Sequence, residues 1–252
     1  MKGFEDKVAL VTGGASGIGQ AAALMFAREG AKAVIADIGD DSGEETVKMI
    51  KDAGGEAIFV KTDVSQSSDL EALINKINET YGRLDYALNN AGTMGQFGKT
   101  TGCTEENWDF TMNLNLKGVW LSMKYEIPEM QKQGGGAIVN TSSMTGLRGS
   151  PGFPAYDASK HGVVGLTKTA ALEYAKAGIR VNAVCPSFVI TPMMQGFTRG
   201  SQEALDRLAA KTPLKRIATS EDVAEAVVWL CSDASSFITG QALLLDGGLS
   251  AE

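Results

Sequence analysis

The sequence predicts an α/β protein, built as a doubly wound, seven-stranded parallel sheet with helices on both faces. Short apolar runs rich in β-branched residues alternate with amphipathic segments along the whole chain, as expected for buried parallel strands linked by helices. The first apolar run leads through a glycine-rich loop straight into a helix. No Pro/Ser-rich linker, repeat or low-complexity stretch breaks the pattern, so we expect residues 1–252 to form one domain.

The individual elements follow from apolar periodicity and from glycine or capping residues at their ends. Asn113 and Asn115 are poor helix formers in the middle of one long helix, and we expect one of them to distort it. Ser220 is the expected N-cap of the last helix. Strands are expected at residues 7–12, 32–37, 56–61, 84–88, 137–140, 179–184 and 241–245. Helices are expected at residues 20–29, 40–53, 68–81, 104–133, 156–177 and 221–231.

Composition excludes several classes of function. The formal charge of −7 and the absence of any Lys/Arg run argue against nucleic acid as a partner. No apolar stretch approaches the roughly 18 residues that span a bilayer, and the N-terminus lacks a signal-peptide pattern, so we expect a soluble, cytoplasmic protein with no membrane partner. The cysteines are three in number and far apart, and His161 is the single histidine, so no metal site is expected.

The loop after the first strand has the pattern of a phosphate-binding turn. Glycines there allow backbone N–H groups at the start of a helix to approach a pyrophosphate, which the helix dipole also favours. The flanking strand and helix are both in place, so the unit predicts a Rossmann fold that binds a dinucleotide. The residues expected to touch the cofactor in this loop are Gly13, Ser16, Gly17, Ile18 and Gly19.

Asp37 ends the second strand, 18 residues after Gly19, near the spacing at which a carboxylate binds the adenosine ribose. A carboxylate repels the 2′-phosphate of NADP, and residues 38–43 contain no Lys or Arg. The expected cofactor is therefore NAD, with Ile38 beside it. The alternative for Asp37 is a helix cap or a solvated strand end.

Two further strand ends offer cofactor contacts, each with a structural alternative. Asp63 and Val64 follow the third strand, where Asp63 either binds the adenine amino group or only caps a turn. Asn90, Ala91 and Gly92 follow the fourth strand, at the edge where ligands bind in such sheets, although turn chemistry alone also explains them.

Tyr156 and Lys160 lie at i and i+4 of a helix, and so on one face of it. A fixed ammonium favours the ionised form of a phenol, and we expect Lys160 to lower the pKa of Tyr156. In isolation the pair is more typical of an exposed helix surface. Ser143 on the preceding loop, together with the glycine loop, favours a proton-transfer site instead. His161 is expected to have a structural role, against a partner helix or in the core.

These residues together resemble the short-chain dehydrogenase/reductase family over essentially the whole chain. The resemblance is carried by Thr12-Gly13-x-x-x-Gly17-x-Gly19, Asn89-Asn90-Ala91-Gly92, Asn115-Leu-Lys-Gly118, Ser143 and Tyr156-x-x-x-Lys160, in register. It implies that Asn115, Ser143, Tyr156 and Lys160 are catalytic, with a water held by Asn115 linking Lys160 to solvent. It also implies cofactor contacts from Tyr156, Lys160, Pro186, Val189 and Thr191. Ser187 stands where the family usually has glycine, which puts the substrate preference in doubt.

The function implied is reversible hydride transfer between NAD and a secondary alcohol or ketone, with a homotetramer formed through residues 104–133, 156–177 and the last strand. Residues 187–213 are read as a mobile lid over the substrate, or else as a plain two-helix excursion. The expected substrate contacts are Ser143, Thr145, Phe153, Tyr156, Phe188 and Met194. Further candidates for the pocket are Met94, Phe97, Met144, Leu147, Met193 and Phe197, with Arg148 and Arg199 as the nearby cations.

The apolar pocket favours a small, uncharged cyclic or aryl-alkyl substrate. The alternatives within the family are a sugar (aldose) 1-dehydrogenase and a 3-oxoacyl-acyl-carrier-protein reductase. A non-catalytic dinucleotide sensor on the same fold would lack the Ser/Tyr/Lys set, which this chain has. A nucleotide-sugar epimerase-like enzyme would have a longer chain and a different glycine spacing.

Overall fold

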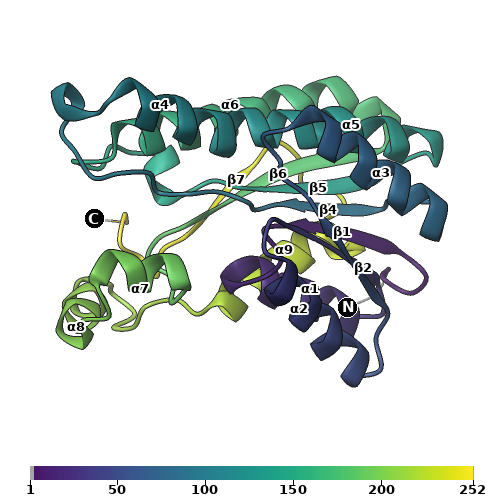
Figure 1. The fold of residues 1–252 in the computed structure, drawn as a ribbon, viewed down its shortest axis with the longest axis horizontal. Coiled ribbons are helices and arrows are strands. Elements are labelled where there is room, and N and C mark those ends of the chain that lie inside the picture. The colour runs from purple at the N-terminus through teal and green to yellow at the C-terminus, as the bar shows by residue number, and fades with distance from the viewer. Residues whose placement is uncertain (1–2, 252) are drawn as a thin grey trace.

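The computed structural model describes residues 3–251 and confirms the α/β class with one seven-stranded parallel sheet (Figure 1). The strand order is β3-β2-β1-β4-β5-β6-β7, so the sheet grows in one direction from β1 to β3 and in the other from β4 to β7. This switch point between β1 and β4 is where ligands bind in such sheets. The strands are β1 (Val8–Thr12), β2 (Lys32–Asp37), β3 (Ala57–Lys61), β4 (Tyr86–Asn89), β5 (Gly136–Thr141), β6 (Ile179–Pro186) and β7 (Ala242–Leu245).

Helices cover both faces of the sheet, with α3–α6 on one face and α1, α2 and α9 on the other (Figure 1). Two short helices, α7 and α8, follow β6, so residues 187–213 have the secondary structure of the two-helix alternative. The helices are α1 (Gly17–Arg28), α2 (Asp40–Asp52), α3 (Ser67–Tyr81), α4 (Glu105–Met112), α5 (Gly118–Lys132), α6 (Pro154–Tyr174), α7 (Pro192–Thr198), α8 (Gln202–Lys211) and α9 (Ser220–Cys231).

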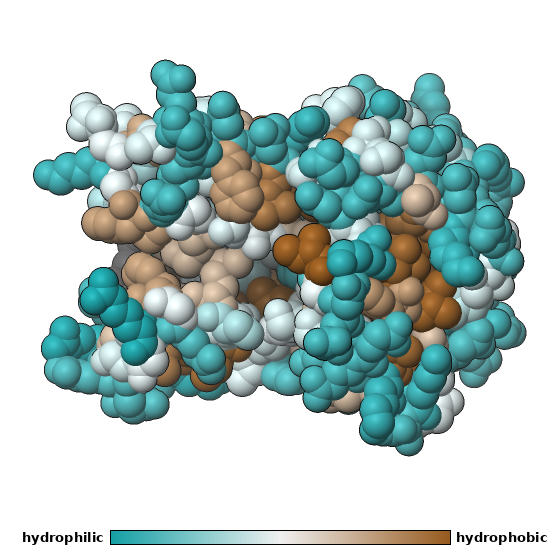
Figure 2. Space-filling view, viewed as in Figure 1, coloured by the Kyte–Doolittle hydropathy of each residue, from teal (hydrophilic) through white to brown (hydrophobic). Residues whose placement is uncertain are grey.

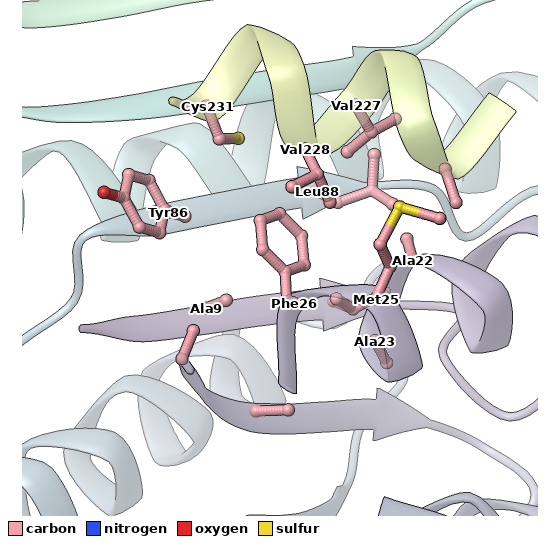
Figure 3. Packing of buried hydrophobic residues seen from close by; sticks show 14 of the residues in the cluster. Ala9, Ala22, Ala23, Met25, Phe26, Tyr86, Leu88, Val227, Val228 and Cys231 are labelled. Carbon is pink, nitrogen blue, oxygen red and sulfur yellow. The ribbon is translucent and has the colours of Figure 1, made fainter. Parts of the chain in front are cut away.

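The core lies on both sides of the sheet, because each strand buries its two faces. On one side, α1 and α9 meet over β1 and β4, and their side chains point toward one another (Figure 3). Phe26 of α1 stacks on Tyr86 of β4 with 6.1 Å between ring centroids, and Phe4 lies 5.0 Å from Tyr86. The Tyr86 hydroxyl donates to the Gly3 carbonyl at 2.6 Å, so its polar end is satisfied.

The long, distorted helix expected over residues 104–133 is present as one unbroken helical run, in which a π-helical turn at Asn113–Lys117 joins α4 to α5. Within this turn the Gly118 N–H donates to the Asn113 carbonyl, five residues back. The Asn115 side chain is fully buried and bonds the backbone of Thr93. The extra residue in the turn brings this amide inward, so the distortion has the polar cause that its sequence suggested.

Other element ends also differ from expectation: α1 begins at Gly17 rather than residue 20, and β4 covers Tyr86–Asn89 rather than residues 84–88. The catalytic-candidate helix begins at Pro154 rather than Tyr156, because proline is well suited to the first helical turn, and a 3₁₀ turn at Ala175–Ala177 follows its end. The N-cap of α9 is Thr219 rather than Ser220. The Thr219 hydroxyl accepts from the Asp222 N–H at 3.2 Å, and the Asp222 carboxylate accepts from the Thr219 N–H at 2.7 Å, which is a complete capping box.

Candidate active site

A cleft of about 890 Å³ opens at the carboxyl ends of the strands. Its walls come from the segments that follow β1 to β6, and from α4, α6 and α7. Figure 2 shows the hollow between the upper helices and the α7–α8 side of the molecule, with pale and brown residues on its walls. The cleft therefore lies where the sheet topology predicts a ligand site.

The glycine loop shapes one end of this cleft. Gly13 and Gly17 have positive φ angles, of 64° and 56°. A Cβ on Gly19 would lie 2.0 Å from the Gly13 carbonyl oxygen, so only glycine fits there. Ser16 is the N-cap of α1 but makes no side-chain capping hydrogen bond. The first N–H groups of α1 thus lack a side-chain acceptor, and the loop has the form of an anion-binding cradle.

Asp37 lies at the cleft wall beside this loop, and its carboxylate accepts from the Ala15 and Gly39 N–H groups, both at 3.1 Å. Ile38 also lines the cleft and is 68% exposed. Asp63 lines the cleft as well, while its Oδ1 accepts from the Ser65 N–H at 2.9 Å. The turn role considered for Asp63 is therefore present, and the adenine role stays a prediction.

Asn90 ties the end of β4 to the glycine loop. Its Nδ2 donates to the Gly13 carbonyl at 3.2 Å, and its Oδ1 accepts from the Thr141 hydroxyl at 3.3 Å. The Thr12 hydroxyl accepts from the N–H groups of Asn90 and Ala91, at 3.0 and 3.3 Å. Asn90, Ala91 and Gly92 all line the cleft, so this segment forms a turn and also part of the cleft wall.

Ser143, Tyr156 and Lys160 meet on the cleft floor, where β5 ends and α6 begins. Lys160 Nζ lies 5.6 Å from the centroid of the Tyr156 ring and donates to the Thr141 carbonyl at 2.8 Å. The Ser143 hydroxyl accepts from the Thr145 N–H at 3.2 Å and from the Thr145 hydroxyl at 3.3 Å. Three side chains that are separated in the sequence thus converge at one point of the cleft.

Burial dominates the proton affinities of this site. It raises the pKa of Tyr156 above the usual value near 10, while a hydrogen bond with Ser143 acts in the opposite direction. Burial also lowers the pKa of Lys160 to about 8. The expected lowering of the phenol pKa by Lys160 does not occur in the chain by itself, because desolvation of the phenolate is the largest influence on this pKa and Lys160 is not among the influences.

Asn115 lies behind the site rather than in the cleft wall. Its Oδ1 accepts from the Thr93 N–H and its Nδ2 donates to the Thr93 carbonyl, both at 2.8 Å, and Nδ2 also donates to the Ser159 hydroxyl at 3.1 Å. These bonds join the loop after β4 to α6, one residue before Lys160. Asn113, the other candidate for the distortion, is exposed and lines the cleft.

Most of the residues expected to form the substrate pocket line the cleft, and most of them are apolar. Thr145, Phe153, Phe188 and Met194 all line it, with Met94, Met144, Met193, Phe197 and Arg148. Phe153 is 9% exposed and contacts Phe97 and Phe197, with ring centroids 5.5 and 6.0 Å away. Of the residues proposed from sequence, five are outside the lining: Gly19, Phe97, Asn115, Leu147 and Arg199.

Pro186, Val189 and Thr191 line the cleft beside the glycine loop, as does Ser187. His161 lies on the exposed side of α6 rather than in the core, with Nδ1 2.9 Å from the Asp157 carbonyl oxygen, because Lys160 takes the buried side. Sequence reasoning missed several lining residues whose only signal is a place near a strand or helix end: Thr62, Ser65, Thr93, Phe110, Leu114, Thr141, Ser142, Ser150, Pro151 and Asp157.

Within residues 3–251, no helix has the length and apolar character needed to cross a membrane. In the same range, no group of three or more His, Cys, Asp or Glu side chains could hold a metal ion. All three cysteines are free thiols.

Comparison with known proteins gives matches over nearly the whole chain. A family model described as enoyl-(acyl carrier protein) reductase matches residues 13–250. A cyclohexanol dehydrogenase from Acinetobacter sp. (strain SE19) is 40% identical over 249 residues, which cover 99% of this chain and 97% of the relative. The crystal structure of levodione reductase superposes with a TM-score of 0.96 at 35% identity and covers 99% of both chains. An actinorhodin polyketide ketoreductase solved with NADPH gives a TM-score of 0.94 at 37% identity over 100% of both chains.

The glycine loop, the cluster of Ser143, Tyr156 and Lys160 on the cleft floor, and the matches over nearly the whole chain all indicate the same class of protein. They support an oxidoreductase with a nicotinamide cofactor site in the cleft. The chain belongs to the short-chain dehydrogenase/reductase family.

Proposed function

We propose that this protein reversibly interconverts a secondary alcohol and a ketone, with NAD as the hydride carrier. The observation that carries the proposal is the meeting of Ser143, Tyr156 and Lys160 on the cleft floor, between a glycine cradle and an apolar pocket. A bound nicotinamide would supply the hydride acceptor or donor. The chain itself binds and orients both reactants and moves the proton.

Tyr156 is the proton-transfer group in this proposal. In alcohol oxidation its oxygen takes the hydroxyl proton, and in ketone reduction it returns that proton to the carbonyl oxygen. Ser143 hydrogen-bonds the substrate oxygen and stabilises charge that develops on it. Because burial raises the pKa of Tyr156 in the chain alone, Lys160 and the positive charge of an oxidised nicotinamide must together favour the phenolate.

Lys160 has a second role in the proposed site. Its buried ammonium donates to the Thr141 carbonyl and lines the cleft. It can bind the nicotinamide ribose from this position. Asn115 holds the adjacent loop and α6 together and, in this proposal, positions a water between Lys160 and solvent. Pro186, Val189 and Thr191 form the wall for the nicotinamide carboxamide.

The preference for NAD over NADP is supported by Asp37. Its carboxylate lies at the cleft wall beside the glycine loop, with Ile38 as its exposed neighbour. Lys61, the nearest basic residue on β3, is paired with Asp40 at 2.6 Å and is therefore not free for a 2′-phosphate. A negative group at this place favours two ribose hydroxyls over a phosphate.

The apolar lining supports a small, uncharged cyclic or aryl-alkyl substrate. Phe153, Phe188, Met144 and Met194 line the same cleft as Tyr156, and the hydroxyls of Ser143 and Thr145 lie 3.3 Å from each other in it. The names of two relatives, a cyclohexanol dehydrogenase and a levodione reductase, also fit cyclic substrates. Ser187, in place of the family's usual glycine, adds a side chain to the nicotinamide end of the cleft.

We also propose that the enzyme is cytoplasmic and assembles as a homotetramer. Trp120 on α5 and Leu172 on α6 are 46% and 85% exposed, and both lie on the helix layer that covers one face of the sheet. All four residues of the edge strand β7 are only partly buried. Large exposed apolar side chains and an open sheet edge are typical of surfaces that pair with another copy.

The reaction is tested by measuring NADH and NADPH oxidation with a panel of uncharged cyclic ketones, 3-oxoacyl thioesters and keto acids. Aldoses are assayed in the opposite direction, by measuring the reduction of NAD and NADP. We expect turnover of a cyclic ketone with NADH and weaker turnover with NADPH. Preference for NADPH would contradict the role of Asp37. Preference for the acyl thioester or the aldose would replace the proposed substrate class by one of the two alternatives.

The assignment of Tyr156 is tested by Tyr156→Phe, which removes only the hydroxyl. We expect turnover to fall by at least about 10²–10⁴-fold, because general acid–base catalysis is lost, while NADH still binds. Tyr174→Phe, at the other end of α6, is the matched control and should keep full activity. Substantial turnover by Tyr156→Phe would refute the assignment.

A further inference from the structure

Four buried polar side chains form a cluster directly beneath the site. They are Asn89 at the end of β4, Glu126 on α5, Asn140 on β5 and Thr167 on α6, and none is more than 2% exposed. Asn89 Nδ2 donates to Glu126 Oε2 at 3.1 Å and to Asn140 Oδ1 at 3.0 Å. Asn140 Nδ2 donates to the Thr167 hydroxyl at 3.0 Å. The cluster therefore ties two central strands to two covering helices.

Glu126 is the one acidic member of this cluster, and it has no charged partner. Asn89 gives it a single hydrogen bond, and its Oε1 and the Asn89 Oδ1 are both buried without a partner. A buried carboxylate with one neutral donor is strongly disfavoured. A carboxylic acid has an O–H donor that can satisfy one of these buried oxygens, so the neutral form suits the cluster better.

The surrounding elements offer no charge that would offset ionisation. The only influences on the pKa of Glu126 are burial, which raises it to about 7, and the Asn89 hydrogen bond, which opposes the rise. Strand β5 carries no titratable residue. On β4, the Tyr86 hydroxyl is bonded to Gly3. On β6, Arg180 bonds carbonyls at the end of α9, and Cys185 lies beside Lys160.

The charged side chains of the nearby helices are likewise either exposed or bonded to groups other than Glu126. Lys160 of α6 is bonded to Thr141, and Asp69 of α3 accepts from the Asp63 N–H. The exposed charged residues of these helices and of the π-helical turn are Glu71, Lys76, Glu79, Lys117, Lys124, His161, Lys168 and Glu173. Glu129 of α5 is paired with Lys132. Asp157, in the first turn of α6, accepts from the Ser150 N–H at 2.5 Å, and the Tyr125 hydroxyl of α5 lies 2.7 Å from the Ser67 hydroxyl.

The cluster is one residue away from two contacts that build the site. Asn89 and Asn140 are paired in the β4–β5 register, and each precedes a residue of the cleft. Asn90 follows Asn89 and bonds the Gly13 carbonyl of the glycine loop. Thr141 follows Asn140, and its carbonyl accepts from Lys160 Nζ. The side-chain bond between Asn89 and Asn140 thus adds to the backbone pairing of β4 and β5 at both strand ends.

We propose that Glu126 is a positioning residue that works as a neutral carboxylic acid. In this form it holds Asn89 against Asn140, and so sets the ends of β4 and β5 that carry the contacts to the glycine loop and to Lys160. Its ionisation places an uncompensated charge in the cluster and loosens both contacts. The positioning role rests on the proposed site, whereas the titration of Glu126 is independent of the reaction.

The direction of the pH effect follows from proton linkage. A carboxyl that holds its proton more tightly in the folded chain than in the unfolded chain destabilises the fold as pH rises. The loss begins above the unfolded value of about 4.3 and is complete above about pH 7. Glu126→Gln keeps the shape of the neutral acid and cannot ionise, so it should remove this loss.

The test compares wild type, Glu126→Gln and the exposed control Glu173→Gln at pH 5 and pH 8.5. We expect the folding equilibrium constant of Glu126→Gln, relative to wild type, to rise between these pH values on the order of a hundredfold. The control should follow wild type. An unchanged ratio would refute the titration of Glu126, and carboxyl ¹³C NMR of wild type, in which one glutamate should titrate near pH 7, tests the same point without a variant.

The positioning role is read from NADH affinity and from the pH profile of kcat/KM. Wild type should lose NADH affinity relative to Glu126→Gln as pH rises through 7, whereas Glu126→Ala should bind weakly at every pH and the glutamine variant should restore binding. If stability shifts with pH as expected while NADH affinity and kcat/KM do not differ between wild type and Glu126→Gln, the positioning role is wrong. NADH affinity needs no substrate, so failure of this test is separable from failure of the proposed reaction.

Discussion

Single residues set the shape of the cleft mainly through close backbone approach. At Gly19 the space for a side chain is occupied by the Gly13 carbonyl oxygen, 2.0 Å from the position of an added Cβ, and by Asn90 Nδ2 at 2.8 Å. The Gly13 carbonyl oxygen also accepts a hydrogen bond from Asn90, and this bond links the glycine loop to the end of β4. Gly19 does not line the cleft, and its role is to let these groups meet.

We therefore expect Gly19→Ala to lose NADH affinity by more than tenfold and to destabilise the protein by about 1–3 kcal/mol, the usual cost of overpacking. The measurements are NADH titration and urea unfolding. Gly196→Ala is the matched control, because a Cβ on Gly196 of α7 meets no atom within 4 Å and alanine is the better helix former. Unchanged NADH affinity in Gly19→Ala would contradict this account.

The helix elements show how local polar groups end or distort regular structure. At the end of α9, the Arg180 guanidinium donates to the carbonyls of Leu230, Cys231 and Ser232, at 2.6, 3.2 and 3.2 Å. It also donates to the Ser235 hydroxyl at 3.1 Å. One side chain from β6 thus satisfies carbonyls that the helix leaves without an internal partner, and its positive charge suits this end of the helix dipole.

Arg180→Lys should destabilise the protein by about 1–3 kcal/mol, because an ammonium cannot reproduce the planar fork of donors. Urea unfolding of the variant checks this value. Arg207→Lys on α8 is the control, since Arg207 forms an exposed pair with Glu203 and should contribute less than about 1 kcal/mol. Equal stability of the two variants would show that the contacts at the end of α9 contribute little.

Sequence reasoning identified the elements well where apolar periodicity is strong and failed where a single contact decides. The strands and Rossmann order follow from local pattern, and Tyr156 and Lys160 follow from helical spacing. The asparagines predicted the distortion at Asn113–Lys117, but its partner Thr93 is distant in sequence and gave no signal. The pKa of Tyr156 depends on burial, which no spacing rule predicts. Glu126 gave no signal, because an acidic residue on a helix is usually exposed.

At the scale of the whole molecule, the sheet with its covering helices contrasts with the α7–α8 segment. Only Thr198 of α7 is buried, and α8 buries none of its residues. The segment is attached at its base, where Ile190 N–H donates to the Ala218 carbonyl at 2.9 Å and Ala218 N–H donates to the Phe188 carbonyl at 3.1 Å. Phe197 of this segment also packs on the ring of Phe153, which lies just before α6.

We expect amide hydrogen exchange in α8 to be faster by at least about tenfold than in α9, because few buried contacts oppose local opening. Native-state exchange followed by mass spectrometry measures both helices in one sample, so α9 is an internal control. Equal protection of α8 and α9 would show that the segment is held by contacts beyond those within residues 3–251, such as a second copy of the chain.

One wall of the cleft is formed by the strand ends and α6, and another by the lightly packed segment α7–α8, of which α7 lines the cleft. This difference affects how the enzyme can evolve. Phe197 and Met194 line the cleft from α7, whereas Gly13 and Asn90 follow strands β1 and β4, and Lys160 lies on α6. Substitutions in α7, which lines the cleft, change substrate contacts at little cost in stability, while the parts that handle the proton and the cofactor are left intact. New substrates can therefore be acquired through this segment by small steps, each of which keeps a folded enzyme.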